Sequence, residues 1–181
     1  MKKLKLLLLT ILLTLGSSAM ANSANDIEND ADETLKLFYS EIKGSKAYLK
    51  KAKAYLVFPD IKEAGFFMGG KYGEGVLRVK GESKAYYSIT SASMGFQMGM
   101  KTYGMVIAFS TDAALNKFLL DDDEWEADVD GNIAMAEWNS KEELEDVDFA
   151  ESMVAFVLDS KGMMGSLTME GTKFKRIHPD D

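Results

Sequence analysis

Residues 64–77 read Ala64-Gly65-Phe66-Phe67-Met68-Gly69-Gly70-Lys71-Tyr72-Gly73-Glu74-Gly75-Val76-Leu77. The stretch combines aromatic and aliphatic residues with closely spaced glycines, and glycine-rich, aromatic and β-branched sequence continues to residue 110. Short runs of this composition, separated by turn residues, are typical of β-strands. The pattern predicts strands at residues 64–71, 74–80, 84–90, 92–101 and 103–110.

The turns between these strands are predicted from short glycine-containing segments. They fall at Tyr72-Gly73, Gly81-Glu82-Ser83 and Thr102-Tyr103-Gly104. An apolar strand at residues 55–58 precedes the sheet, and Pro59-Asp60 is expected to end it in a turn. Within residues 92–101 apolar side chains alternate strictly with glycines and polar residues, which gives the predicted strand one apolar face. That face consists of Met94, Phe96, Met98 and Met100.

Helical spacing is found on both sides of this region. Apolar residues recur every three or four positions from Ile27 to Ile42, which predicts a helix that ends at Gly44. Further helices are expected at residues 45–51 and 112–120, and further strands at the ranges 125–138, 153–158 and 163–170. The fold class is therefore α+β and mainly β. We expect N-terminal helices and a glycine-rich, curled antiparallel sheet or barrel of about eight strands with one inserted helix.

The first 21 residues have the features of a secretory signal peptide. Lys2, Lys3 and Lys5 precede an apolar run, and small residues ending in Ala19-Met20-Ala21 follow it. The run is too short for a permanent membrane anchor, and we expect cleavage after Ala21. Residues 22–181 then form a single domain with a core at about residues 31–177. The expected location is the periplasm or the secreted fraction.

The distribution of charge limits the possible partners. Without the three lysines of the signal sequence the chain has 18 basic and 29 acidic residues, which makes nucleic acid an unfavourable partner. Residues 36–101 contain twelve basic and five acidic residues, whereas residues 102–160 contain two and sixteen. This asymmetry either gives the protein one face for anionic partners or cancels when the two regions interleave in space.

Several chemical functions find little support in the sequence. The chain has no cysteine, which excludes thiol chemistry and disulfides. Its only histidine, His178, lies three residues from the end, where a catalytic geometry is hard to maintain. The glycines between residues 65 and 75 do not follow the dinucleotide-binding order and stand between strands. We therefore expect no enzymatic activity, no catalytic residue and no cofactor.

One motif has the ligand spacing of a calcium loop. Glu126, Asp128 and Asp130 occupy alternate positions, Gly131 follows, and Glu137 stands at the twelfth position. Glutamate replaces the aspartate preferred at the first position, and the flanking pattern predicts strands instead of helices. A hairpin that turns at Asp130-Gly131 explains the same residues without a metal, and we favour it over calcium binding.

Three ordered blocks resemble the SYLF domain family and together cover about residues 31–177. The first comprises residues 52–59 and 64–77, with Tyr55-Leu56-Val57-Phe58-Pro59 at its centre. The second runs from Ser88 through residues 95–99 to Phe109, and the third comprises residues 160–164 and 167–171. The resemblance implies a bacterial exported member of a family that binds lipid, with some eukaryotic members also binding actin.

We accordingly expect a non-catalytic protein that associates with phospholipid membranes or holds an acyl chain. The candidate headgroup residues are the lysines of the second helix and its surroundings, Lys43, Lys46, Lys50, Lys51 and Lys53. The candidate apolar contacts are Phe38, Ile42, Met94, Phe96, Met98 and Met100. The alternative is a structural or protein-interaction module of the cell envelope, for which the sequence identifies no partner.

Overall fold

The computed structural model describes residues 22–65, 68–94, 99–120, 124–127, 129–136, 151–158 and 169–180. Its helices are α2 (Ala24–Glu41), α3 (Ser45–Lys51) and α4 (Asp112–Leu120). Its long strands are β1 (Ala54–Gly65), β2 (Met68–Val79), β3 (Glu82–Met94) and β4 (Gly99–Phe109). The shorter strands are β5 (Trp125–Glu126), β6 (Ala134–Ala136), β7 (Met153–Leu158) and β8 (Lys173–Ile177). No helix in these ranges is both long and apolar enough to cross a membrane.

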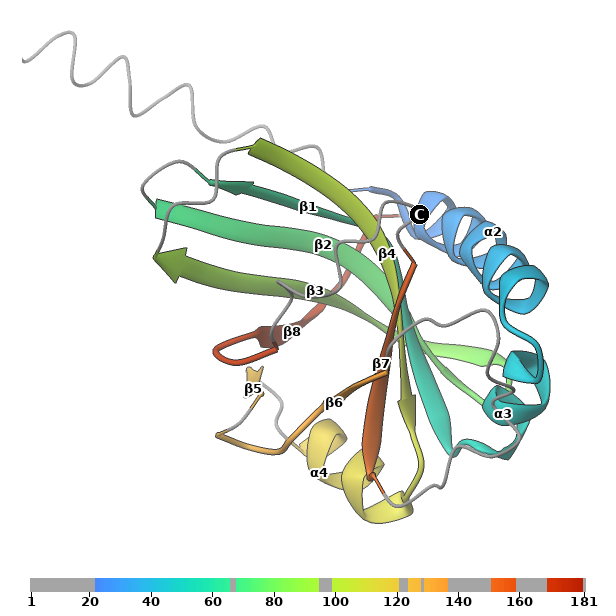
Figure 1. The fold of residues 1–181 in the computed structure, drawn as a ribbon. Coiled ribbons are helices and arrows are strands. Elements are labelled where there is room, and N and C mark those ends of the chain that lie inside the picture. Colours follow the sequence, from blue (N-terminus) through green and yellow to red (C-terminus); the bar gives the residue numbers. More distant parts are fainter. Residues whose placement is uncertain are drawn as a thin grey trace, which may run out of the picture.

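The strands form one curled sheet in the order β5-β8-β3-β2-β1-β4-β7-β6. Neighbouring strands are antiparallel except for β6 and β7, which are parallel, so the predicted all-antiparallel sheet is wrong at this edge. β5 and β6 follow each other in the chain but occupy opposite edges of the sheet. The short segment between them spans from edge to edge only because the sheet curls into a half-barrel (Figure 1). The predicted α+β, mainly β class is confirmed.

The long strands continue through three of the predicted turns. β1 passes through Pro59, where its register with β2 shifts between Val57 and Asp60. Proline has no N–H to donate to a ladder, and a bulge is one of the few places in a sheet that accepts it. β2 likewise runs through Tyr72-Gly73, and β4 through residues 102–104. These glycines therefore make room for neighbouring backbone and do not reverse the chain.

The predicted strand at residues 92–101 is also wrong, because β3 ends at Met94 and β4 begins at Gly99. β3 is antiparallel to β2 and β4 is antiparallel to β1, so the chain reverses direction between them. The β2–β3 turn, by contrast, lies one residue before its predicted place. Lys80 and Gly81 have φ values of 54° and 85°, as a two-residue type I′ turn requires.

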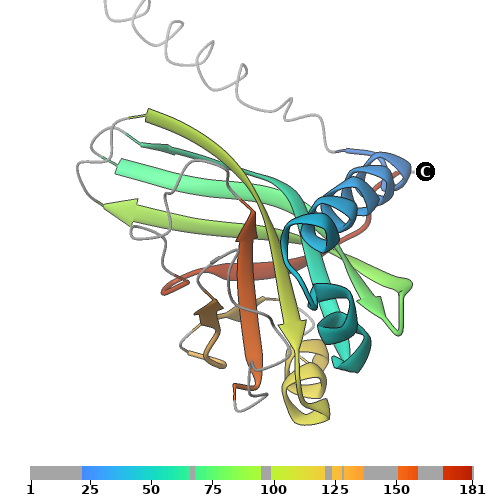
Figure 2. The ribbon, with the colours of Figure 1, turned by 45° about the vertical axis from the view of Figure 1, so that its right-hand side comes forward.

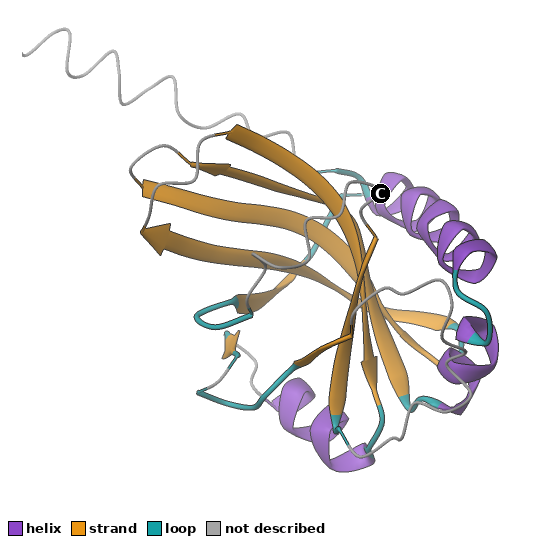
Figure 3. Cartoon of the chain, viewed as in Figure 1, coloured by secondary structure: helices purple, strands orange, loops and turns teal. Residues whose placement is uncertain are grey.

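Two apolar cores lie on opposite faces of the sheet. On the convex face, α2 and α3 bury the predicted helical stripe, including Ile27, Phe38 and Ile42, against β1, β4 and β7. Figures 1 and 2 both show these helices along the same side of the sheet. On the concave face, Phe118 of α4 packs against Trp125 and other rings of the sheet. Figure 3 shows α4 at the end of the half-barrel near β5 and β6.

An ion-pair cluster fixes the position of α2 on the sheet. The guanidinium of Arg78 on β2 lies 2.6 Å from carboxylate oxygens of both Glu28 and Asp32 on α2. The hydroxyl of Tyr86 donates to Glu28 over 3.1 Å. Burial disfavours the charged form of Glu28, but hydrogen bonds from Ser83, Arg78 and Tyr86 outweigh it and lower its pKa. The cluster fixes the first half of α2 beside β2.

Candidate functional site

The short helix α3 is tied to the end of α2 by its first residue. Gly44 adopts a φ of 85° between the two helices, a conformation that favours glycine. The buried hydroxyl of Ser45 is within hydrogen-bond distance of the carbonyl oxygens of Ile42 (2.7 Å) and Phe38 (3.2 Å). These contacts orient α3 so that Tyr48 and Leu49 are buried and its lysines are exposed.

A groove of about 390 Å³ lies where α2, α3, the start of β1 and the β2–β3 turn meet. We call it the basic groove. Three lysines line it, and its other residues are tyrosine, aliphatic or glycine, with no acid among the lining residues that the structure describes. The lining residues are Tyr39, Lys46, Leu49, Lys50, Ala52, Tyr55, Lys80 and Gly81. The groove thus combines positive charge with an apolar floor.

Tyr39 of the basic groove remains neutral at physiological pH because its pKa is raised. Burial and the neighbouring Tyr55 raise the pKa of Tyr39 to about 12. The Lys46 ammonium lies 5.9 Å from the centroid of the Tyr39 ring, within the range of a cation–π contact. Because Lys46, Lys50 and Lys80 are all exposed, an anion entering the groove would meet three ammonium groups without first breaking a buried ion pair.

Only two of the five predicted headgroup lysines line the basic groove, namely Lys46 and Lys50. Lys43 and Lys51 are exposed beside it. Lys53 instead faces α4, where its ammonium lies 3.0 Å from the Asp112 carboxylate. Lys80 was not among the predicted headgroup residues and enters the groove from a turn that lies thirty residues after Lys50 in the chain. The Lys80-Gly81 dipeptide was the available signal, because it suits a type I′ turn.

The residues predicted to contact the apolar part of a lipid do not form one exposed surface in the described structure. Phe38 and Ile42 are buried in the convex core, with exposed fractions of 0% and 6%, so neither presents a surface for lipid. Both side chains belong to the apolar stripe by which α2 packs onto the sheet. Met100 is 82% exposed, whereas Phe96 and Met98 lie outside the described residues, as does the side chain of Met94.

The exposed Met100 is also far from the basic groove. It pairs with Ala64 near the end of β1, whereas α3 adjoins the beginning of that strand at Ala54. Ten residues of extended chain separate the two positions by roughly 30 Å. Figure 1 shows the ends of the long hairpins on the opposite side of the molecule from α3. The headgroup lysines and the exposed methionine therefore do not form one continuous site.

In the structure, two of the predicted calcium ligands, Glu126 and Asp130, interact with other protein groups. Glu126 lies on β5, where its carboxylate is 3.5 Å from the Lys173 ammonium. Asp130 accepts the backbone N–H of Glu126 over 2.8 Å. Asp128 and Glu137 lie outside the described residues, and within the described ranges no three acidic or histidine side chains could hold a metal. The favoured hairpin is wrong too, because β5 pairs with β8 and β6 with β7.

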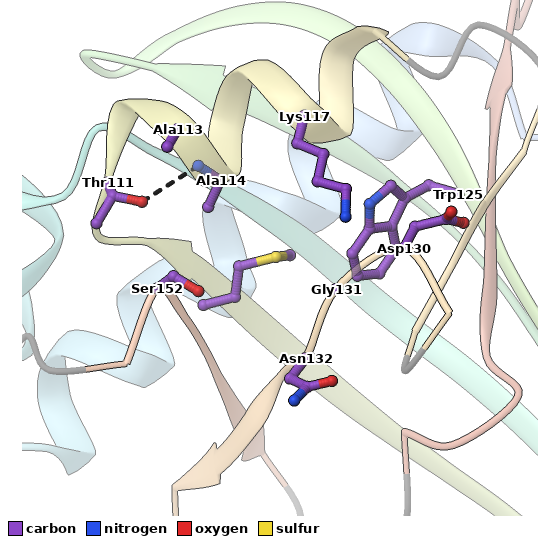
Figure 4. A pocket seen from close by; sticks show the side chains of 10 residues that line it. Thr111, Ala113, Ala114, Lys117, Trp125, Asp130, Gly131, Asn132 and Ser152 are labelled. Atoms are coloured by element: carbon purple, nitrogen blue, oxygen red, sulfur yellow. Dashed lines mark hydrogen bonds between the residues drawn. The ribbon is translucent and has the colours of Figure 1, made fainter.

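A second pocket, of about 290 Å³, lies between α4, the β5–β6 segment and the start of β7 (Figure 4). We call it the closed-end pocket. Lys117, Trp125, Asp130, Asn132 and Ser152 give it polar groups of both charges. Its remaining lining residues are Thr111, Ala113, Ala114, Gly131 and Met153. Of these residues, only Asp130 and Gly131 belonged to a predicted site, the calcium loop.

A third group of charged residues lies on the concave face, away from both pockets. Glu63 of β1 pairs in register with Lys71 of β2 and with Lys101 of β4. The Tyr103 hydroxyl lies 3.5 Å from the Glu63 carboxylate. Burial lowers the pKa of Lys71 to about 8, although the charge of Glu63 acts in the opposite direction. His178 is exposed beyond β8 and does not adjoin this group in the sequence or the sheet.

These features define the class of the protein as an α+β half-barrel domain with a basic groove on its helical side. A family model described as Ysc84, Las17-binding protein actin regulator, matches residues 90–178. The chain therefore belongs to the SYLF (Ysc84) family, as its sequence blocks predicted. The match includes the residues of the closed-end pocket but begins after those of the basic groove, which lie between 39 and 81. A search of curated proteins gave no match to the chain.

Proposed function

We propose that the protein is an exported, non-catalytic lipid-binding protein that contacts anionic phospholipid headgroups through the basic groove. The observation that carries the proposal is the convergence of Lys46, Lys50 and Lys80 over a floor of tyrosine and aliphatic side chains. Such a surface attracts a phosphate and accepts the adjoining glycerol or acyl methylenes. Export is supported by the signal-peptide pattern of residues 1–21.

The charge of the whole chain makes the groove necessary for this binding. The formal charge is −8 for the whole chain and −11 without the three lysines of the signal sequence (18 basic against 29 acidic residues), so the protein as a whole is repelled by an anionic membrane. Only a local cluster that meets the surface within a Debye length, about 8 Å at physiological salt, can reverse that repulsion. Each lysine close to an anionic surface contributes about 1 kcal/mol. Binding should therefore be weak, orientation-specific and sensitive to salt.

Co-sedimentation with vesicles tests the proposal. The test variant reverses Lys46, Lys50 and Lys80 to glutamate, and the matched control reverses Lys36, Lys62 and Lys175, which are exposed elsewhere. Both variants have the same net charge. We expect the test variant to lose at least about 3 kcal/mol of binding to phosphatidylglycerol vesicles at low salt, roughly a 100-fold loss of affinity.

The control variant should retain more of the binding, because its lysines do not converge. Equal losses in the two variants would show that net charge alone governs association and would refute the groove as the contact surface. Failure of the unmodified protein to sediment with anionic vesicles at low salt would refute the lipid proposal itself. Vesicles of phosphatidylcholine alone should retain little protein, since they offer no net negative charge.

The second candidate function is a structural or protein-interaction module of the cell envelope. The matched family is described as binding a protein, Las17, and as regulating actin. Leu120 and Val129 are also 81% and 73% exposed, as apolar contacts for a protein partner would be. Native mass spectrometry separates the two functions: co-purified phospholipid supports the first, and a stable complex without lipid supports the second.

A further inference from the structure

The closed-end pocket contains a buried hydrogen-bond donor that has no acceptor. Trp125 is 2% exposed, and its indole nitrogen makes no hydrogen bond within the part of the chain that the structure describes. A buried donor usually has a partner, and one without a partner at the wall of a pocket identifies where a ligand atom can bind. This donor was not used in the proposed lipid contact, whose groove lies on the convex face.

The position of the indole is set by packing on several sides. The ring centroid of Trp125 lies 5.5 Å from that of Phe118 and 5.6 Å from that of Phe174. On another side the ring approaches Gly131 so closely that a β-carbon there would lie 2.9 Å from the indole Cζ2. Because the ring cannot turn without disturbing these contacts, its N–H has a fixed direction, as a preorganised binding group requires.

A cation lies beside this donor. Figure 4 shows the side chain of Lys117 extending from α4 toward the edge of the indole that contains the nitrogen. Both residues line the pocket, and Lys117 forms no ion pair with a residue of the described ranges. The first turn of α4 also borders the pocket through Ala113 and Ala114, and a helix N-terminus favours negative charge. Two side-chain donors and a helix end thus suit an acidic group.

The pocket also contains an acid, which excludes a simple anion as the best ligand. Asp130 is held in place because its Oδ2 accepts the backbone N–H of Glu126 over 2.8 Å. A plain anion in the same pocket would be repelled by this carboxylate. We propose that the closed-end pocket binds a small zwitterion, whose acidic group accepts from Trp125 and Lys117 and whose ammonium group faces Asp130.

The size of the pocket limits the ligand to a small molecule or a headgroup. About 290 Å³ is at the lower end of the range for ligand pockets and is too small for a whole phospholipid. A free amino acid and a phosphoethanolamine group both carry an acidic group and an ammonium group. The amino acid is a soluble metabolite, whereas phosphoethanolamine also occurs as the headgroup of a lipid. The inference does not depend on the basic groove, and either proposal can fail without the other.

Heteronuclear NMR of the indole N–H provides a direct test. The chain has two tryptophans, so a Trp138→Phe background leaves the Trp125 indole signal alone. The probes are phosphoethanolamine, alanine, inorganic phosphate and ethanolamine, each titrated at neutral pH. We expect at least one zwitterion to shift the Trp125 indole proton downfield in a saturable manner, with phosphate and ethanolamine each binding at least about tenfold more weakly.

Two substitutions assign the charges. Lys117→Met and Asp130→Asn should each weaken zwitterion binding by about tenfold or more, whereas the control Lys36→Met on the exposed side of α2 should leave it unchanged. If phosphoethanolamine binds and alanine does not, the ligand is a lipid headgroup. If alanine binds and phosphoethanolamine does not, the ligand is a free amino acid. The proposal is overturned if neither zwitterion shifts the indole signal, if phosphate alone binds as tightly, or if both pocket variants bind normally.

Discussion

Replacement of Gly75 by alanine tests whether the bulge in β1 requires a residue without a side chain at the opposite position of β2. Gly75 lies opposite the segment where β1 changes register around Pro59. A β-carbon on Gly75 would lie 2.6 Å from Cδ1 of Phe58 and closer still to the carbonyl oxygen of Val57. Ordinary carbon contacts are about 3.5–4.0 Å, so the overlap is about 1 Å. Phe58 is fully buried and cannot move aside.

The expected loss of stability follows from two opposing effects. Alanine restricts the unfolded chain more than glycine does, which stabilises the protein by about 0.4–1 kcal/mol. Forcing a methyl group into filled space costs about 1–3 kcal/mol or more, and here a backbone carbonyl must also shift. We expect Gly75→Ala to lower the free energy of unfolding by about 3 kcal/mol, or to prevent folding. Gly70→Ala is the control, because its β-carbon would lie 3.1 Å from the carbonyl oxygen of Ser91.

Urea unfolding followed by tryptophan fluorescence measures both variants against the unmodified protein. The control needs an adjustment of only a few tenths of an ångström and should remain within about 1 kcal/mol of the parent. If Gly75→Ala and Gly70→Ala have the same stability, or if Gly75→Ala is more stable than the parent, the bulge does not require glycine. The role assigned to these glycines would then be wrong.

Two further predictions concern charged groups. Arg78→Met should cost about 2–4 kcal/mol in urea unfolding, because it leaves Glu28 and Asp32 without their cation, and adding Glu28→Gln should recover part of the loss. The pKa of Lys71 is lowered to about 8 in the folded protein, from an ordinary value of 10.5. Above pH 8 the unfolded chain therefore binds more protons than the folded chain does. Stability should therefore rise by about 2 kcal/mol from pH 8 to 9.5, and Lys71→Met should abolish the rise; a rise that persists in the variant contradicts the assignment.

The helices and the general β character were predictable because their signals are local. The stripe from Ile27 to Ile42 repeats with the period of a helix, and the structure buries it as expected. The turns at Tyr72-Gly73 and residues 102–104 were mispredicted, since a glycine inside a long strand looks the same in sequence as a glycine in a turn. Only the bulge in the neighbouring strand distinguishes the two, and that strand is another part of the chain.

The candidate sites were less predictable than the fold. Lysines on α3 were visible in the sequence, yet which of them line the groove depends on how Ser45 and Gly44 orient that helix. Phe38 and Ile42 were predicted to contact lipid because an amphipathic helix has the same pattern whether it packs on a sheet or on a membrane. Trp125 and Lys117 gave no motif, since their relation arises from α4 and β5 lying together at one end of the half-barrel.

The sequence by itself determined the helical stripes, the β-rich composition, the separation of charge and the family blocks, because each depends on residues close together in the chain. The tertiary structure decided what those residues meet. It placed Lys80 beside Lys46 and Lys50, buried Phe38, and left the indole N–H of Trp125, a residue that lines the closed-end pocket, without an acceptor. The physical reason is that strand register and the curl of the sheet result from packing across the whole domain, which no local segment encodes.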